Sequence, residues 1–243
     1  MSDSAKTQNA IVARLTSKFS GYIYHHESLL TDNEETYAIN WFNTKSQWLY
    51  DLYNFLAAGS VIKVGGKPFM KGRLVNKLYG ESRAQRTVLL IVRYPSVLRF
   101  KNMLESKMFQ AVSILRSLAV SGFTFGFSKR HDQVGSLAPD DTANGKPMYG
   151  VIHFSGDIDF NDVLALARAH PDSELIFASE IAGRLATGKI DSEPTAVPCI
   201  MNGIAVLRSV KPDCFKLVLE SEQFLTLKNN SDDVFFGVYD RVF

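Results

Sequence analysis

Two kinds of apolar pattern alternate along the chain: short continuous runs, typical of buried strands, and runs at helical spacing. Five consecutive aliphatic residues at 88–92 predict the clearest strand, over residues 87–93, and Pro95 follows it. A short apolar run with aromatic residues predicts an earlier strand over residues 37–42. The other strands predicted in this half of the chain span residues 60–64, 74–79 and 123–127.

Helical spacing occurs between these strands. One predicted helix follows Thr44, whose hydroxyl suits a helix N-cap, and ends at Gly59. Its apolar positions are Trp48, Leu49, Leu52, Tyr53, Phe55 and Leu56. Ser96 is placed to cap a second, amphipathic helix, and a further helical stretch covers residues 109–118.

The chain contains an internal repeat. Residues 100–106 recur as residues 215–221, with five of seven positions identical at an offset of 115. Further collinear matches at offsets of 111 to 115 pair 91–93 with 206–208, 72–74 with 183–185, and 125–127 with 236–238. A collinear series of this kind indicates a duplication, with units over residues 37–131 and 149–243.

The remaining residues form a linker and an extension. Residues 132–148 join the two units and are rich in turn-forming residues. Residues 1–36 precede the repeat, and Ile11, Leu15 and Phe19 at four-residue spacing predict a helical extension up to Gly21. The elements predicted in the second unit span residues 149–154, 160–169, 174–179, 204–208, 213–224 and 234–239, with a longer loop at Pro194 and Pro198.

This order of elements predicts an α+β fold made of two tandem ferredoxin-like domains. The strand at 88–92 has no polar face, so both of its faces must be covered. Helices of the same unit can cover one face, and the sheet of the other unit can cover the second. We therefore expect the two domains to pack sheet to sheet as an intramolecular α+β barrel.

Composition places the chain among globular proteins. Its 243 residues are 46% hydrophobic and 21% charged, and no apolar run reaches the ~18 residues that span a bilayer. The first residues lack the basic and then apolar pattern of a signal peptide. Cys199 and Cys214 are too few for a disulfide framework. These features predict a cytoplasmic protein without a membrane partner.

Charge is distributed unevenly between the halves of the chain. Residues 1–131 carry 18 Lys and Arg against 8 Asp and Glu, whereas residues 132–243 carry 9 against 17. The asymmetry fits two halves that dock by opposite charge, and it also fits a basic module for nucleic acid or an anionic ligand. Glycines interrupt the densest basic cluster, at 63–77, and no nucleic-acid-binding motif accompanies it, which disfavours nucleic acid.

The first unit resembles the domain-of-unknown-function 1330 family of the dimeric α+β barrel superfamily. The residues that carry the resemblance are Gly59, Val64-Gly65-Gly66, Lys71-Gly72, Leu78-Tyr79-Gly80, Tyr94-Pro95-Ser96, Glu105-Ser106, Phe109 and Arg116. The resemblance implies a small-molecule site, since the superfamily includes cofactor-free monooxygenases, isomerases, haem-dependent enzymes and non-catalytic binders. The family usually has Glu before the aromatic-Pro-Ser motif, where this chain has Arg93 and, in the second unit, Arg208.

Arginines at equivalent positions are the first candidates for ligand binding. Arg93 and Arg208 follow equivalent strands, where a planar guanidinium could bind a carboxylate or phosphate. The alternative is an ion pair with a helix carboxylate such as Glu105 or Glu220. Arg73 recurs as Arg184 beside a glycine, and could either hold an anion or lie on the surface. Arg116 fits both a ligand contact and a structural salt bridge.

His153 occupies the strand position that Trp41 has in the first unit. It could act as an acid or base near neutral pH, or it could be a hydrogen-bonded core residue.

Two short motifs are poor candidates for a metal or phosphate site. The His25-His26-Glu27 run disfavours a shared metal, because adjacent side chains diverge, and the glycines at 65–66 lack the spacing of a phosphate-binding loop. We therefore predict no metal and no cofactor.

The sequence predicts a protein that binds a small, partly aromatic, anionic compound in a pocket of the first domain, with catalysis left open. Trp41, Tyr94 and Phe109 would form apolar walls. Arg73, Arg93, Arg116, His153 and Arg208 complete the predicted set of ligand contacts. The alternative is a non-catalytic scaffold or regulatory protein whose basic half binds an acidic protein or nucleic acid. The predicted state is a monomer with pseudo-two-fold symmetry, or a homodimer.

Overall fold

The computed structural model describes residues 23–25, 32–80, 86–131, 134, 146–156, 159–186, 203–211 and 213–242. Of residues 23–25 and 182–186 it describes the backbone alone. The predicted helix before Gly21, the loop at Pro194 and Pro198, and most of the predicted linker lie outside these residues. None of the described helices is long and apolar enough to cross a membrane.

Both units contain the same order of elements. In the first unit these are β2 (Thr36–Thr44), α2 (Gln47–Lys63), β3 (Lys67–Tyr79), β4 (Val88–Tyr94), α3 (Val97–Glu105), α4 (Lys107–Ala119) and β5 (Val120–Arg130). In the second they are β6 (Met148–Ser155), α5 (Phe160–Arg168), β7 (Glu174–Ala186), β8 (Gly203–Ser209), α6 (Cys214–Glu220), α7 (Glu222–Asn229) and β9 (Asp233–Arg241). A short strand, β1 (Ile23–His25), pairs with the end of β7. The duplication seen in the sequence is therefore a duplication of structure.

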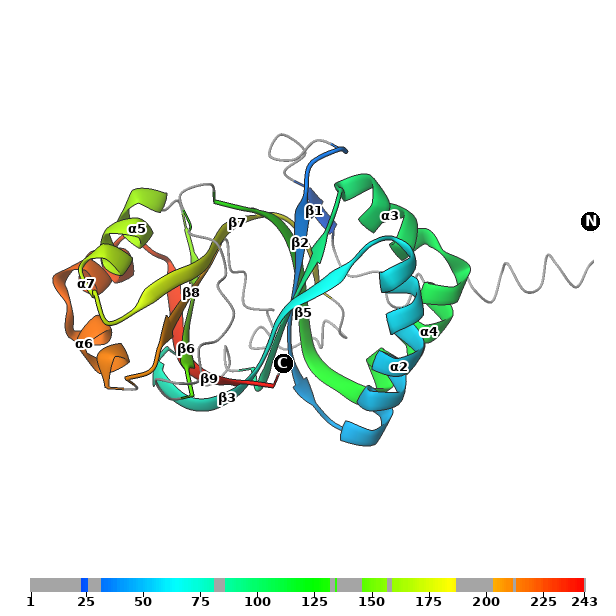
Figure 1. Ribbon diagram of the computed structural model, residues 1–243, viewed down its shortest axis with the longest axis horizontal. Helices are drawn as coiled ribbons and strands as arrows, with labels where there is room; N and C mark the ends of the chain where they lie inside the picture. The colour runs from blue at the N-terminus through cyan, green and yellow to red at the C-terminus, as the bar shows by residue number, and fades with distance from the viewer. Residues whose placement is uncertain are drawn as a thin grey trace, which may run out of the picture.

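The strands form one closed antiparallel sheet rather than two sheets stacked face to face. Neighbours run in the order β7, β5, β2, β4, β3, β9, β6 and β8, and β8 pairs again with β7. Figure 1 shows α2, α3 and α4 on one side of this barrel and α5, α6 and α7 on the opposite side. The expected sheet-to-sheet packing is thus corrected to an edge-to-edge junction within a single barrel.

The long strands β3 and β7 make this junction. Residues 67–73 of β3 pair with β4 of the same unit, and residues 72–79 pair with β9 of the other unit. In the same way, β7 pairs with β8 through residues 174–180 and with β5 through residues 179–186. Closure leaves none of the eight strands with an unpaired edge, which removes a site of aggregation.

Three apolar cores fill the protein. Side chains that alternate along the strands of both units fill the barrel interior, with Ile39, Leu89, Ile91, Val151 and Ile204 among them. The alternate positions face outward and form one core under the helices of each unit. This arrangement explains why strands such as β4 are apolar at successive positions, since both faces are covered.

The helix α2 differs from the sequence prediction at both ends. Its N-cap is Ser46, whose hydroxyl accepts from the Leu49 amide, and not Thr44. The helix continues through Gly59 to Lys63, so the strand predicted over residues 60–64 is wrong. The chain turns at Gly65, whose φ of 80° is open to glycine without strain.

Strand registers correct one part of the repeat. Lys67 and Glu174 pair with the equivalent residues Arg93 and Arg208, so β3 and β7 correspond at an offset of 107, not 111. The structural equivalent of Arg73 is therefore Glu180 and not Arg184. Residues 183–185 resemble residues 72–74 in sequence, but they lie four residues further along β7 than the structural equivalents of 72–74.

Several ion pairs between described residues lie within one half of the chain. In the first half, Lys101 pairs with Asp32 and Lys129 with Glu34, and in the second half Lys211 pairs with Asp172. The ladders β3–β9 and β5–β7 join the units instead. Docking of the halves by opposite charge receives no support from these residues.

Candidate functional site

Trp41 and His153 meet inside the barrel. They occupy equivalent positions, since Trp41 pairs with Leu89 on β4 and His153 pairs with Ile204 on β8. Their rings stack with centroids 3.9 Å apart and an interplanar angle of 22°. Both side chains are buried, so this aromatic pair joins the two units across the interior of the barrel.

Hydrogen bonds hold the indole of this pair in place. Trp41 Nε1 donates to the hydroxyl of Tyr239 at 3.0 Å, and that hydroxyl donates to the carbonyl of Arg86 at 3.1 Å. Phe235 contacts the indole edge-on at a centroid distance of 5.4 Å. The guanidinium of Arg86 lies 5.8 Å from the centroid of Trp41 and donates through Nε to the carbonyl of Gly122. The indole is therefore rigidly placed.

The imidazole of His153 is not held in this way. Neither Nδ1 nor Nε2 has a hydrogen-bond partner among the described residues, although the side chain is buried. The buried hydroxyls of Thr124 and Ser179 also lack partners there. Ser179 pairs with Arg130, six residues along β5 from Thr124, whereas Thr124 pairs with Trp41 and belongs with His153 to one layer of the barrel. Buried polar groups are normally hydrogen-bonded, so this layer is suited to a polar occupant.

A small cavity lies in this layer. It has room for about one water molecule in the present side-chain arrangement. Its lining consists of Ile39, Trp41, Thr124, Phe125, Gly126, His153 and Ile181. The walls thus come from both units, so the cavity does not belong to the first domain alone.

Burial determines the protonation of these groups. Burial lowers the pKa of His153 from 6.5 to about 3, and the charge of Arg86 acts in the same direction. The imidazole is therefore neutral at pH 7 and offers one donor and one acceptor to an occupant. Burial raises the pKa of Tyr239, so its hydroxyl stays protonated and remains a donor.

Arginines gather at inward-facing positions near the start of β2 and β6. Arg208 pairs with Glu174, to which its Nε donates at 3.1 Å, and Arg93 pairs with Glu35. Both arginines thus form ion pairs, but the predicted partner, a carboxylate on a helix, is wrong. The carboxylates come from a strand and from the segment before β2, and not from Glu105 or Glu220.

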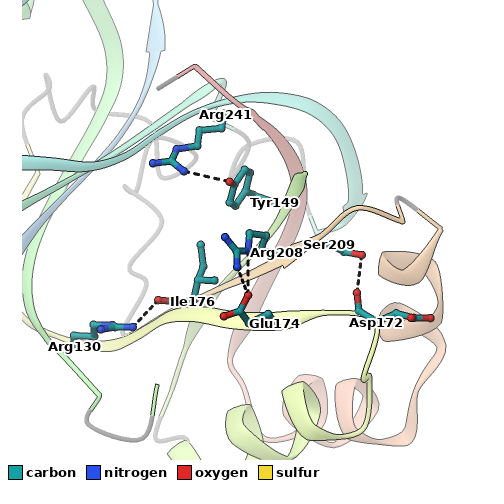
Figure 2. Close-up of polar contacts among 8 residues, drawn as sticks. All are labelled: Arg130, Tyr149, Asp172, Glu174, Ile176, Arg208, Ser209 and Arg241. Atoms are coloured by element: carbon teal, nitrogen blue, oxygen red, sulfur yellow. Dashed lines mark hydrogen bonds and ion pairs between the residues drawn. The ribbon is translucent and has the colours of Figure 1, made fainter. Parts of the chain in front are cut away.

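Two further arginines belong to this group, and the sequence analysis missed them. Arg130 donates through Nη2 to the carbonyl of Ile176 at 3.0 Å, and Arg241 donates to the hydroxyl of Tyr149 at 3.5 Å. Figure 2 shows Arg130 of β5 and Arg208 of β8 bonded to Ile176 and Glu174, two residues of β7, with Arg241 above Tyr149. Arg130 and Arg241 are equivalent positions of the repeat, at an offset of 111. Each follows its matched segment, 125–127 or 236–238, by three residues, so the repeat could have revealed both.

A tyrosine accompanies each arginine group. Tyr37 donates to Glu35 at 2.8 Å, and its equivalent Tyr149 pairs with Arg208 across the β6–β8 ladder. Burial and Glu35 raise the pKa of Tyr37 to about 12, against the opposing charges of Arg93 and Arg130. Each unit therefore presents a phenol beside its guanidinium groups.

The structure does not bring the remaining predicted contacts to this cavity. Tyr94 and Phe109 lie in the outer core of the first unit, where the Tyr94 hydroxyl contacts Met103 Sδ at 3.5 Å. Arg116 lies over the ring of Phe123, 4.3 Å from its centroid, in the same outer layer. Arg73 is exposed on β3. Tyr94 lies on the outer face of its strand, and Phe109 and Arg116 lie on α4 outside the sheet, so the sheet separates them from Trp41 and His153 in the barrel interior.

The last candidates are residues that could bind a metal ion or supply a reactive thiolate. Among the described side chains, no group of three His, Cys, Asp or Glu lies close enough to hold a metal ion. The side chains of His25-His26-Glu27 and Cys199 lie outside the described set. Cys214 is buried, and burial raises the pKa of its thiol, which disfavours a reactive thiolate.

No family model and no curated protein matches this sequence. Solved structures do match over most of the chain. An anthrone oxidase-like protein aligns over 91% of this chain and 95% of its own, with a TM-score of 0.53 and 8% identity. A Fusobacterium nucleatum subsp. nucleatum protein with the provisional name monooxygenase aligns over 88% and 94%, with a TM-score of 0.51 and 7% identity.

A mutant chlorite dismutase from Candidatus Nitrospira defluvii aligns over 88% of this chain and 94% of its own, with 13% identity and a TM-score of 0.47. At such identities the likeness concerns the fold and not the activity. The matched proteins are dimeric α+β barrel proteins. The closed eight-stranded sheet with helices on two sides agrees with this likeness. The chain therefore has the dimeric α+β barrel fold, with both halves of the barrel supplied by one polypeptide.

Proposed function

We propose that the protein binds a small, partly aromatic, anionic compound inside the barrel, in the layer of Trp41 and His153. The observation that carries this proposal is that two polar groups lining the cavity, the His153 imidazole and the Thr124 hydroxyl, are buried without hydrogen-bond partners among the described residues. A buried polar group without a partner costs ~1–3 kcal/mol. A ligand with a hydroxyl or carbonyl group would offset that cost.

The aromatic character of the ligand follows from the Trp41–His153 stack. The indole is held by Tyr239, whereas no hydrogen bond among the described residues holds the imidazole. A flat ring could therefore take the place of the imidazole against the indole if the His153 side chain moves, because the cavity alone has room for only about one water molecule. The neutral imidazole and the hydroxyl of Thr124 would then orient the ring by hydrogen bonds.

The anionic character follows from the arginines. Arg93 lies four residues along β4 from Leu89, the neighbour of Trp41, which is ~13 Å of strand. Arg208 has the same relation to Ile204 in the second unit. A compound with its ring beside Trp41 and a carboxylate or sulfonate directed toward these arginines would combine stacking on the indole with an ion pair to a guanidinium group.

The fold and the sequence motifs support this class of ligand. The matched proteins with TM-scores above 0.5 are named as anthrone oxidase-like and, provisionally, as a monooxygenase, and the first name refers to an aromatic compound, an anthrone. We also propose kinship of the first unit with the domain-of-unknown-function 1330 family, supported by Val64-Gly65-Gly66 and Tyr94-Pro95-Ser96. The composition supports a cytoplasmic location.

Fluorescence can test the proposal with salicylate as the probe, in a Trp48→Phe background that leaves Trp41 as the reporter. We expect salicylate to quench Trp41 saturably, and His153→Phe to weaken binding by at least about 10-fold, the equivalent of one hydrogen bond. Benzyl alcohol, which lacks the charge, should bind more weakly than salicylate.

Arg73→Met is the matched control, because Arg73 is an exposed arginine outside the barrel interior. Its binding should equal that of the parent. Native mass spectrometry of the purified protein would also detect a retained ligand. Binding of salicylate that is unaffected by His153→Phe, or no binding of salicylate and no retained aromatic compound, would contradict the proposal.

A further inference from the structure

The helix α2 is apolar on two opposite faces. One face, with Tyr50, Tyr53 and Ala57, is buried against the sheet and α4. The other face is exposed, and its side chains repeat every seven residues: Trp48 is 70% exposed, Phe55 80% and Ile62 70%. With Leu52 and Gly59 between them, the spacing is four, three, four and three. We call Trp48, Leu52, Phe55, Gly59 and Ile62 the α2 seam.

The composition of α2 sets this face apart from an ordinary exposed helix. A helix on a protein surface normally carries charged residues on its outer face. The 17 residues of α2 include only two charged residues, Asp51 and Lys63. Aromatic enrichment and depletion of charge are typical of the central part of a protein interface. Figure 1 shows α2 on the outer side of the barrel, where a partner could reach it.

We propose that the α2 seam is the contact through which two copies of this chain form a dimer, with α2 packed antiparallel to α2 of the second copy. Alternating spacings of three and four are the pattern by which helices pack along one another at a shallow angle. A two-fold axis brings the same surface from both copies together, which is the commonest arrangement in homo-oligomers.

Gly59 gives the seam complementary shape. An added Cβ at Gly59 would meet no atom within 4 Å, so a partner side chain can approach the helix backbone closely there. In an antiparallel pair, Trp48 of one copy lies over Gly59 of the other, and Leu52 lies against Phe55. The largest side chain of the seam is thus matched to its smallest residue.

The seam supplies part of the area that a stable dimer interface needs. Aromatic side chains bury ~150–250 Å² each, so Trp48 and Phe55, at exposures of 70% and 80%, contribute ~225–375 Å² per copy, to which Ile62 adds a smaller area. A standard interface buries ~800 Å² per partner. The adjoining helix α4, whose end is hydrogen-bonded to the start of α2, exposes Ile114 and Leu118 and can contribute further area.

Sedimentation velocity of the full chain tests the proposal. We expect a dimer near twice 27.1 kDa, and Phe55→Glu should raise its dissociation constant by at least about 30-fold, the effect of losing one aromatic hot spot. Because Phe55 is exposed, this substitution should leave the fold of the monomer unchanged. Dilution should shift the emission of exposed Trp48 to the red, while Trp41 remains buried in both states.

Two further variants separate the seam from general stickiness. Leu217→Glu is the matched control, because Leu217 is 58% exposed on α6 of the other unit, and it should leave the dimer intact. Gly59→Leu adds apolar surface in open space but blocks the close approach, so it should weaken the dimer.

Four results would overturn the proposal. A monomeric wild-type chain would show that another occupant, such as residues 1–22 of the chain or a different protein, covers the seam. A Phe55→Glu variant that remains dimeric would place the interface elsewhere. Loss of the dimer in Leu217→Glu, or a tighter dimer in Gly59→Leu, would also contradict it.

Discussion

Replacement of His153 by phenylalanine is expected to stabilise the protein in the absence of ligand. The imidazole is buried, and its two nitrogens have no partner among the described residues. Phenylalanine keeps a flat ring against Trp41, whose centroid lies 3.9 Å from that of His153. The larger ring can extend into the cavity beside it, which has room for about one water molecule.

The magnitude follows from the cost of an unsatisfied polar group. Removal of that cost is worth ~1–3 kcal/mol in the free energy of unfolding. In a chain of this length, each kcal/mol corresponds to a change in Tm of ~2–4 °C. We therefore expect the Tm of His153→Phe to rise by ~2–12 °C at pH 7 while salicylate binding weakens. Stability and binding would then change in opposite directions at one residue.

Urea unfolding at pH 7, followed by circular dichroism, measures this free energy directly. Thr124→Val is the companion variant, since it removes a buried hydroxyl without a partner and nearly preserves the volume. We expect it to leave the stability unchanged or to raise it. A loss of more than about 1 kcal/mol in His153→Phe would refute the reasoning, because it would show that the imidazole is hydrogen-bonded in the folded protein.

Three other perturbations have defined outcomes. The pKa of His153 is about 3 in the folded protein and about 6.5 in the unfolded chain, so the unfolded chain binds the proton first as the pH falls. The free energy of unfolding should therefore fall by ~1.4 kcal/mol per pH unit below pH 6.5. Urea titrations of His153→Phe should lack this slope. Tyr239→Phe leaves Trp41 Nε1 without an acceptor and should cost ~1–3 kcal/mol in urea unfolding; an unchanged midpoint would contradict this. Gly203→Ala places a Cβ against the ring of Phe154, and the strain should lower the free energy of unfolding by ~1–3 kcal/mol and with it the Tm. A wild-type Tm would show that the ring can move.

Several parts of the candidate site could be predicted from the sequence. Trp41 and His153 were identified as equivalent positions of the repeat, and the ion pairing of Arg93 and Arg208 was foreseen as an alternative. Their contact partners were not foreseen, because Glu35 and Glu174 reach the arginines through the tertiary arrangement of loop and strands. The separation of Tyr94 and Phe109 from Trp41 depends on which face of each strand turns inward, and a strand that is apolar on both faces does not reveal this.

The sequence by itself determined the local elements and their duplication. Apolar spacing and hydroxyl caps are local signals, and they located β4 and the start of α3 at Ser96, where the hydroxyl accepts from the Arg99 amide. The tertiary structure alone decided how the two units join. Whether β3 ends against its own unit or continues along β9 depends on residues more than 150 positions apart, which no local pattern encodes. Closure of the barrel brings Trp41 and His153 together for the same reason, since their stacking is a property of two strands that meet only in the folded protein.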